Sequence, residues 1–253
     1  MSKSGLVNVY NLRRIWEIDF LRGIAIIMMI AFHVLYYINF FNIYYVNLST
    51  FLFLIFNYSI GTIFLLLVGI SLTISYSMAK TKLTERGLKF KYLKRGLRIF
   101  LLGLLITCVT WYFLVEGFVI FGVLHCIGIS IIISYQFLKY RFLNLVLGTI
   151  CIIIGFLLYD LEFDFYWLVW LGFKPYGFYT IDYFPILPWF GVILIGIYLG
   201  NNLYVKRKRT YYIKDLTGNV IVRFLMYLGR HSLIIYFLHH IILLSIIYPF
   251  FIF

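Results

Sequence analysis

A histidine and an arginine share one face of the first apolar segment of this chain. His33 follows the apolar run at residues 24–32, and Arg22 lies eleven residues before it. Eleven residues are about three helical turns, so both side chains lie on one stripe, roughly 16 Å apart along the helix axis. An ionisable group inside a membrane span is costly and marks a functional site by default. This pair is therefore the first candidate site.

A second histidine, His125, lies at a comparable depth on another expected span. His33 and His125 are each about seven residues from the outer end of their segments, roughly 10 Å below the outer surface. Both could face one polar cavity, with Asp182 at the outer edge of a later span within reach. Of His239 and His240, at most one is expected to face that cavity, because successive helical residues point about 100° apart.

The chemistry that these residue types support is acyl transfer. Neutral imidazole near pH 7 accepts a proton from an attacking hydroxyl or amine, and a carboxylate can orient the imidazole. We therefore predict His33, His125 and Asp182 as catalytic residues. The structural alternatives stay open: His125 as a residue that hydrogen-bonds one helix to another, and Asp182 as the cap of the helix that follows it.

An acyl donor such as acyl-CoA needs phosphate recognition, for which the sequence offers one dense group of cations. Lys94, Arg95 and Arg98 lie within about one helical turn where the third span begins. With Arg22 they are predicted to bind the phosphates of the donor, and the distance from Arg22 to His33 suits its pantetheine arm. The alternative is a solvated, lipid-facing basic loop over residues 79–98.

Composition places these residues in an all-α, polytopic membrane protein. Of the 253 residues, 64% are hydrophobic and only 12% are charged, which is typical of an integral membrane protein. We expect a single domain over residues 1–253, with close helix packing at Gly61 and Gly69 and at Gly196 and Gly200. About seven membrane spans are expected, at residues 18–40, 51–78, 96–116, 118–138, 142–160, 184–201 and 225–251.

The basic residues set the expected orientation. With a cytoplasmic N-terminus and an external C-terminus, only Lys174 of the 22 basic residues falls outside. The net charge of +13 then reports topology and contact with anionic membrane lipid rather than nucleic acid. Residues 1–14 do not form a cleavable signal peptide, and the cysteines show no metal-ligand spacing. We expect an integral protein of the cell membrane, with no metal.

Motifs along nearly the whole chain resemble the heparan-α-glucosaminide N-acetyltransferase catalytic-domain family. They are WEIDFLRGIA at 16–25 followed by His33, RGLR at 95–98, FGVLHCIG at 121–128, DYFPILPW at 182–189 and LGRHSLIIYFLH at 228–239. The Arg22-to-His33 spacing is also similar to the Arg-x10-His motif of membrane acyltransferases that O-acetylate surface polysaccharides, where the histidine is regarded as catalytic. The resemblance implies transfer of an acyl group, usually acetyl from acetyl-CoA, across the membrane to a sugar or glycan-like acceptor.

The chain departs from the lysosomal members of that family at one position. They carry Asn where this chain has His33, and their proposed catalytic histidine falls where it has Tyr44. His33 is therefore the expected base here. Two other classes stay open: a transporter or lipid-handling protein without chemistry, and a redox protein in which His33 and His125 hold a haem or metal. The sequence does not fix the acceptor or whether the chain forms a homo-oligomer.

Overall fold

The computed structural model describes residues 15–45, 47–48, 50–114, 116–205 and 208–247. These form eight helices and two small two-stranded sheets. The helices are α1 Trp16–Phe40, α2 Phe51–Ala79, α3 Glu85–Phe113, α4 Val123–Ser134, α5 Phe142–Leu157, α6 Ile186–Leu203, α7 Val220–Arg230 and α8 Ser232–Ile247. Strand β1 (Glu162–Phe163) pairs in parallel with β2 (Lys174–Pro175), and β3 (Tyr204–Val205) pairs antiparallel with β4 (Lys208–Arg209).

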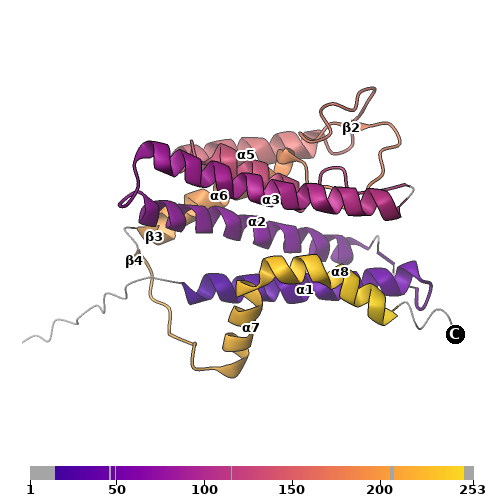
Figure 1. The fold of residues 1–253 in the computed structure, drawn as a ribbon, viewed down its shortest axis with the longest axis horizontal. Coiled ribbons are helices and arrows are strands. Elements are labelled where there is room, and N and C mark those ends of the chain that lie inside the picture. Colours follow the sequence, from indigo (N-terminus) through magenta and orange to yellow (C-terminus); the bar gives the residue numbers. More distant parts are fainter. Residues whose placement is uncertain (1–14, 46, 49, 115, 206–207, 248–253) are drawn as a thin grey trace, which may run out of the picture.

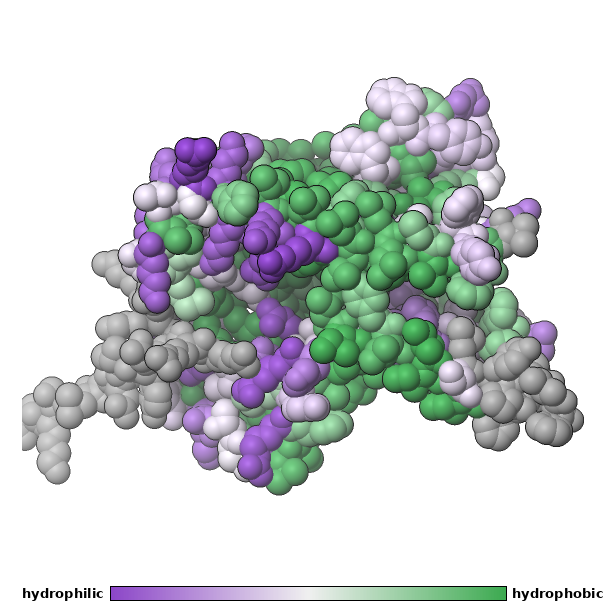
Figure 2. All heavy atoms as spheres, viewed as in Figure 1, coloured by the Kyte–Doolittle hydropathy of each residue, from purple (hydrophilic) through white to green (hydrophobic). Residues whose placement is uncertain are grey.

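Most of the helices run along the long axis of the molecule. α1, α2 and α3 lie in rows along this axis, α8 lies beside α1, and α7 stands at a steep angle to them at the edge of the molecule (Figure 1). α6 packs between α2 and α5, α4 packs on α3, and α1 contacts both α7 and α8. We call the end where α2 turns into α3 the basic end, and the end that carries residues 158–185 the far end. Hydrophilic side chains gather toward the basic end of the face in Figure 2, whereas the other half is mostly apolar.

The prediction of an all-α chain with helices that can span a membrane is confirmed, whereas the number of seven spans is not. Four helices, α1, α2, α3 and α6, are long and apolar enough to cross a membrane, and α7 and α8 make a fifth if this pair, bent by 85°, is one span. The apolar helices α4 and α5 are shorter. The expected seventh span at 225–251 is therefore two described helices, and its last residues lie outside the described part of the chain.

The expected orientation rests partly on residues that the structure does not describe. Lys3, Arg13, Arg14, Lys206 and Arg207 lie outside the described residues, as does the segment 1–14. The structure therefore leaves the cytoplasmic N-terminus as a prediction.

The basic stretch before the third span is helical rather than a loop. α3 begins at Glu85, eleven residues before the predicted start, because the Thr84 hydroxyl accepts a hydrogen bond from the backbone N–H of Gly87 at 3.3 Å. Such a cap satisfies a free N–H of the first turn, and the Glu85 carboxylate favours the same helix end. The cations of α3 consequently have fixed positions around a helix.

Small residues bring the helices together where the sequence predicted. A Cβ atom at Gly69 of α2 would lie 2.2 Å from the carbonyl oxygen of Ile193 of α6, and one at Gly196 2.4 Å from that of Leu66. α1 and α7 meet in the same way, since a Cβ at Gly229 would lie 1.8 Å from the Asp19 carbonyl oxygen. No side chain fits at these backbone contacts, so glycine is required there.

Candidate active site

Three histidines from two helices converge toward the far-end half of α1. The ring centroid of His33 on α1 lies 4.7 Å from that of His239 and 4.6 Å from that of His240, both on α8. The two α8 rings are 4.0 Å apart, and a ring nitrogen of each residue lies within 4.8 Å of the others. We call these three residues the triple-histidine cluster. The expectation that at most one α8 histidine faces the site is wrong, because imidazole rings on successive residues are large enough to converge on His33.

Hydrogen bonds to Nδ1 fix which nitrogen of each ring is free. Nδ1 of His33 lies 2.8 Å from the carbonyl oxygen of Met29, and Nδ1 of His239 lies 2.6 Å from that of Tyr236. A carbonyl only accepts, so both Nδ1 atoms carry the proton and both Nε2 atoms keep a lone pair. Nδ1 of His240 is 2.8 Å from the Tyr37 hydroxyl. The cluster thus holds at least two neutral imidazoles able to accept a proton.

One of these lone pairs has no partner. Nε2 of His239 is buried and makes no hydrogen bond with any described residue, although buried polar atoms are nearly always paired. Beside it, α1 and α8 form a small apolar pocket, lined together with His239 by Ile30, Ile235, Leu238, Ile242 and Leu243. An unpaired nitrogen next to an apolar pocket can interact with a bound molecule.

Asp182 connects the cluster to the start of α4. Its Oδ2 atom accepts a hydrogen bond from the backbone N–H of Val123 at 3.2 Å and one from the Tyr236 hydroxyl at 3.5 Å. The backbone carbonyl of the same Tyr236 accepts from His239. Burial raises the pKa of Asp182 to about 6, although the two hydrogen bonds lower it. Asp182 therefore holds two helices in register and is one residue removed from the cluster.

His125 lies in different surroundings. Its Nδ1 atom accepts from the backbone N–H of Gly122 at 3.2 Å, and its Nε2 atom lies 3.4 Å from the hydroxyl of Thr107 on α3. The ring packs against Phe100 and Phe121, with centroids 5.3 and 5.4 Å away. Both nitrogens are thus used where α3 meets α4. Among the described residues His125 makes no contact with His33, so the structure gives no support to a haem or metal held between them.

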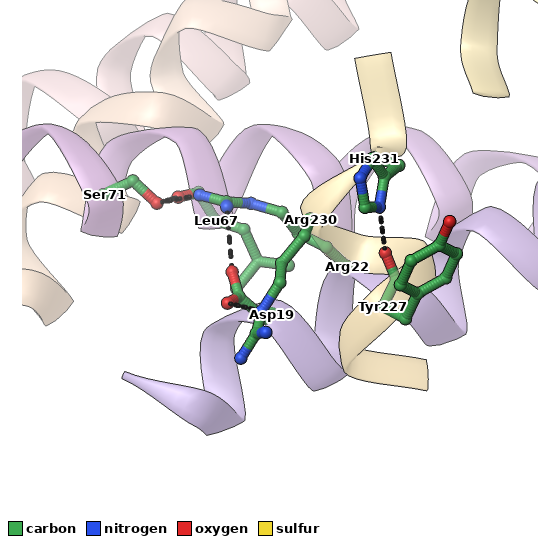
Figure 3. Close-up of polar contacts among 7 residues, drawn as sticks. All are labelled: Asp19, Arg22, Leu67, Ser71, Tyr227, Arg230 and His231. Carbon is green, nitrogen blue, oxygen red and sulfur yellow. Dashed lines mark hydrogen bonds and ion pairs between the residues drawn. The ribbon is translucent and has the colours of Figure 1, made fainter. Parts of the chain in front are cut away.

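At the basic end, the predicted arginine of α1 belongs to a charge network. Asp19 accepts from Arg22 at 3.5 Å and from Arg230 of α7 at 3.2 Å, so it lies between the two guanidinium groups (Figure 3). Arg22 also donates to the hydroxyl of Ser71 on α2. One carboxylate shared by two arginines leaves an excess of positive charge at this position.

The predicted cation patch of α3 is divided between two faces. Arg95 is half-buried and close enough to repel both Arg22 and Lys91, whereas Lys94 and Arg98 are exposed. Sequence reasoning missed Lys91, which donates to the Ser75 hydroxyl of α2 at 3.0 Å. Lys91 lies four residues before Arg95, and residues i and i+4 share a helix face. This spacing could have identified Lys91 as a cation on the same face as Arg95.

A second buried carboxylate at the basic end was not predicted. Both Nε and Nη2 of Arg209 donate to Glu17 at 2.7 Å, and the hydroxyls of Tyr204 and Tyr211 also donate to it, at 3.2 and 3.3 Å. This two-pronged pair fastens the β3–β4 hairpin to the start of α1. Since its carboxylate is fully occupied, Glu17 has a structural role.

Comparison with known proteins identifies one family. A family model described as heparan-alpha-glucosaminide N-acetyltransferase, catalytic, matches residues 14–241. The match includes α1 through most of α8, and with them Asp182 and all three residues of the triple-histidine cluster. No curated protein and no solved structure matches the chain.

Proposed function

Because this chain belongs to the heparan-α-glucosaminide N-acetyltransferase catalytic family, we propose that it is a membrane-embedded acyltransferase. It takes an acyl group, in the first instance acetyl, from acyl-CoA on the cytosolic side and transfers it to a sugar or similar acceptor on the outer side. One observation carries the proposal. His33 of the triple-histidine cluster lies on the same helix as Arg22, about three turns away.

His33 is the proposed general base. Its Nε2 lone pair takes the proton of the acceptor hydroxyl or amine while the acceptor oxygen or nitrogen attacks the thioester carbonyl carbon. The bond from this carbon to sulfur then breaks, and the proton passes from Nε2 to the leaving CoA thiolate. The products are the acylated acceptor and CoA. His33 is suited to this step because Met29 fixes its Nδ1 proton, so that Nε2 remains the basic atom.

His125 and Asp182 are proposed to position the base. Asp182 bonds both the α4 backbone and Tyr236, whose carbonyl in turn holds His239 against His33. His125 fixes the start of α4, from which the N–H of Val123 reaches Asp182. Neither residue needs to contact the substrate. The sequence predicted both as catalytic residues; here they act on the base through the helices.

The donor phosphates are proposed to bind at the basic end. Arg22 and Arg95 are near enough for their charges to repel each other, and Lys91 adds a third cation on the helix face that it shares with Arg95. The exposed Lys94 and Arg98 extend this positive region along α3. From Arg22 to His33 the rise of about 16 Å suits the pantetheine arm, which would place the thioester at the cluster.

Thermal unfolding of the detergent-purified chain tests this proposal. A ligand at about one hundred times its Kd adds about 2.7 kcal/mol to the free energy of unfolding. Acetyl-CoA and CoA should therefore raise the Tm, and ATP at the same concentration should raise it less. Arg95→Ala should reduce the shift, whereas the matched Lys94→Ala, which removes an exposed cation of the same helix, should reduce it less. No shift at millimolar acetyl-CoA would contradict the proposal and favour a transporter.

A further inference from the structure

We propose that the triple-histidine cluster is a binding site for one divalent transition-metal ion, with Zn²⁺ as the reference ion. The proposal uses the same residues as the proposed function, but it depends on their geometry and not on the reaction. Imidazole nitrogen is a preferred ligand of Zn²⁺, Cu²⁺ and Ni²⁺. Three histidines with one open position form a common protein site for zinc.

The separation of the rings suits a shared ion. Zn–N distances of about 2.0–2.1 Å in a tetrahedral site place the nitrogens about 3.4 Å apart. Here the candidate nitrogens of His33, His239 and His240 all lie within 4.8 Å of one another. Binding therefore requires the nitrogens to approach one another by at most about 1.4 Å, the difference between 4.8 and 3.4 Å. The two contributing helices, α1 and α8, already pack against each other.

The surroundings of the three rings match those of metal-bound histidines. Such histidines bind the ion through one nitrogen and use the other in a hydrogen bond that fixes the ring. Each Nδ1 atom of the cluster has an oxygen partner at 2.6–2.8 Å: the Met29 carbonyl, the Tyr236 carbonyl and the Tyr37 hydroxyl. In each ring this arrangement leaves Nε2 as the nitrogen available for a metal ion.

The unpaired nitrogen of His239 is the second, independent observation. Its Nε2 atom is buried without a hydrogen-bond partner among the described residues, and a lone pair left in this state loses the stabilisation that water gave it. A cation held between the three rings supplies the missing partner. In the described part of the chain, no other three His, Cys, Asp or Glu side chains bring their ligand atoms within 4.8 Å of one another.

Metal binding and base catalysis exclude one another in this arrangement. The His33 Nε2 lone pair that would accept the substrate proton is the one that would bind the ion, because Nδ1 is committed to Met29. A bound ion therefore blocks acyl transfer. Zn²⁺ should act as an inhibitor that a chelator reverses.

Cobalt binding tests the site without using the reaction. The full chain, purified in detergent without a polyhistidine tag and stripped with a chelator, is titrated with Co²⁺, whose visible absorption bands report tetrahedral nitrogen coordination. We expect one Co²⁺ per chain, displaced by Zn²⁺. His239→Ala and His240→Ala should each lose the bands, whereas the control His231→Ala, a histidine of the α7–α8 bend outside the cluster, should keep them.

A milder variant covers the case in which an alanine variant fails to fold. Tyr37→Phe keeps all three ligands but removes the oxygen partner of His240, and should weaken Co²⁺ binding by about 10–100-fold. The proposal is overturned if the wild-type chain gives no tetrahedral bands, or if the bands persist in both His239→Ala and His240→Ala. Since neither donor nor acceptor is present, these outcomes are independent of whether the chain transfers acyl groups.

Discussion

Two histidine environments in this molecule differ in how many of their ring nitrogens have hydrogen-bond partners. At the α3–α4 contact, both nitrogens of His125 face protein partners, the Gly122 N–H and the Thr107 hydroxyl. In the triple-histidine cluster, Nδ1 of each ring has an oxygen partner, and Nε2 of His239 is buried with no hydrogen-bond partner in the described part of the chain. Burial and depth alone therefore do not distinguish these two histidine environments. The buried ring nitrogen without a partner does.

The two environments are nevertheless connected through one carboxylate. Asp182 accepts a hydrogen bond from the first residue of α4 and another from Tyr236 of α8. A substitution in one histidine environment can therefore alter the other through the hydrogen bonds of Asp182 or through the packing of the helices. The comparison can thus be tested by substitutions on each side and at the connection.

The largest effect is expected when His33 and His125 are replaced in turn. His33→Ala should lower kcat for acyl transfer by about 10²–10⁴-fold, the usual contribution of a general base, and should leave the Tm shift with CoA intact. His125→Ala should lower kcat much less and lower the Tm instead. Transfer assays with acetyl-CoA and thermal unfolding of both variants separate the two outcomes. Full activity in His33→Ala would show that the base lies elsewhere.

A smaller effect is expected on thermal stability as a function of pH, through the protonation of Asp182. The pKa of Asp182 is raised by burial to about 6 in the folded chain, so the folded state binds the proton more tightly than the unfolded state does. This difference adds up to about 3 kcal/mol to the free energy of unfolding. The contribution is complete below about pH 4 and is lost as the pH rises through 6. The Tm measured across this range should fall with pH.

The control for this prediction is Asp182→Asn. Asparagine keeps an oxygen to accept from the Val123 N–H but does not titrate, so its Tm should vary less over the same pH range. An equally steep pH dependence in wild type and variant would assign the titration to another group.

The smallest effects compare the loss of one hydroxyl beside each histidine. Thr107→Val removes the partner of His125 Nε2 and also the donor to the Val119 carbonyl at 2.7 Å, and should lower the free energy of unfolding by about 1–3 kcal/mol. Tyr37→Phe should change stability less, because the Tyr37–His240 contact is exposed. Chemical denaturation of both variants measures the difference. Equal losses would mean that the cluster is as structural as the His125 contact.

Much of the fold could be predicted because apolar runs mark the helices and small residues mark where helices pack closely, and both are read from neighbouring positions in the sequence. The positions of α1, α2, α5 and α6 follow from their apolar runs, and close packing at Gly69 and at Gly196 follows from small residues at four-residue spacing. The start of α3 could not be found from hydropathy, because a capping hydroxyl at Thr84 continues the helix into a basic segment. The bend of 85° between α7 and α8 lies beside Gly229, which packs against α1, and apolar content reports neither feature.

The candidate site was only partly predictable for a related reason. His33 and Arg22 were identified because both lie on one helix, where spacing gives geometry. His239 and His240 join His33 only through the packing of α8 on α1, and a periodicity argument wrongly separated them. The expected meeting of His33 and His125 relied on depth alone. Depth does not say which helices are neighbours, and His125 lies on the α3 side of the bundle.

The unequal lengths of the helices affect the surrounding lipid. α2 and α3 have 29 residues each and rise about 44 Å, whereas α5 has 16 and rises about 24 Å. The hydrocarbon core of a bilayer is about 30 Å thick, so if the shorter apolar helix α5 crosses it, the lipid beside α5 would have to compress, while the lipid beside α3 would not. A bilayer thinned on one flank brings the two aqueous phases closer together there and shortens the barrier that any transferred group has to cross.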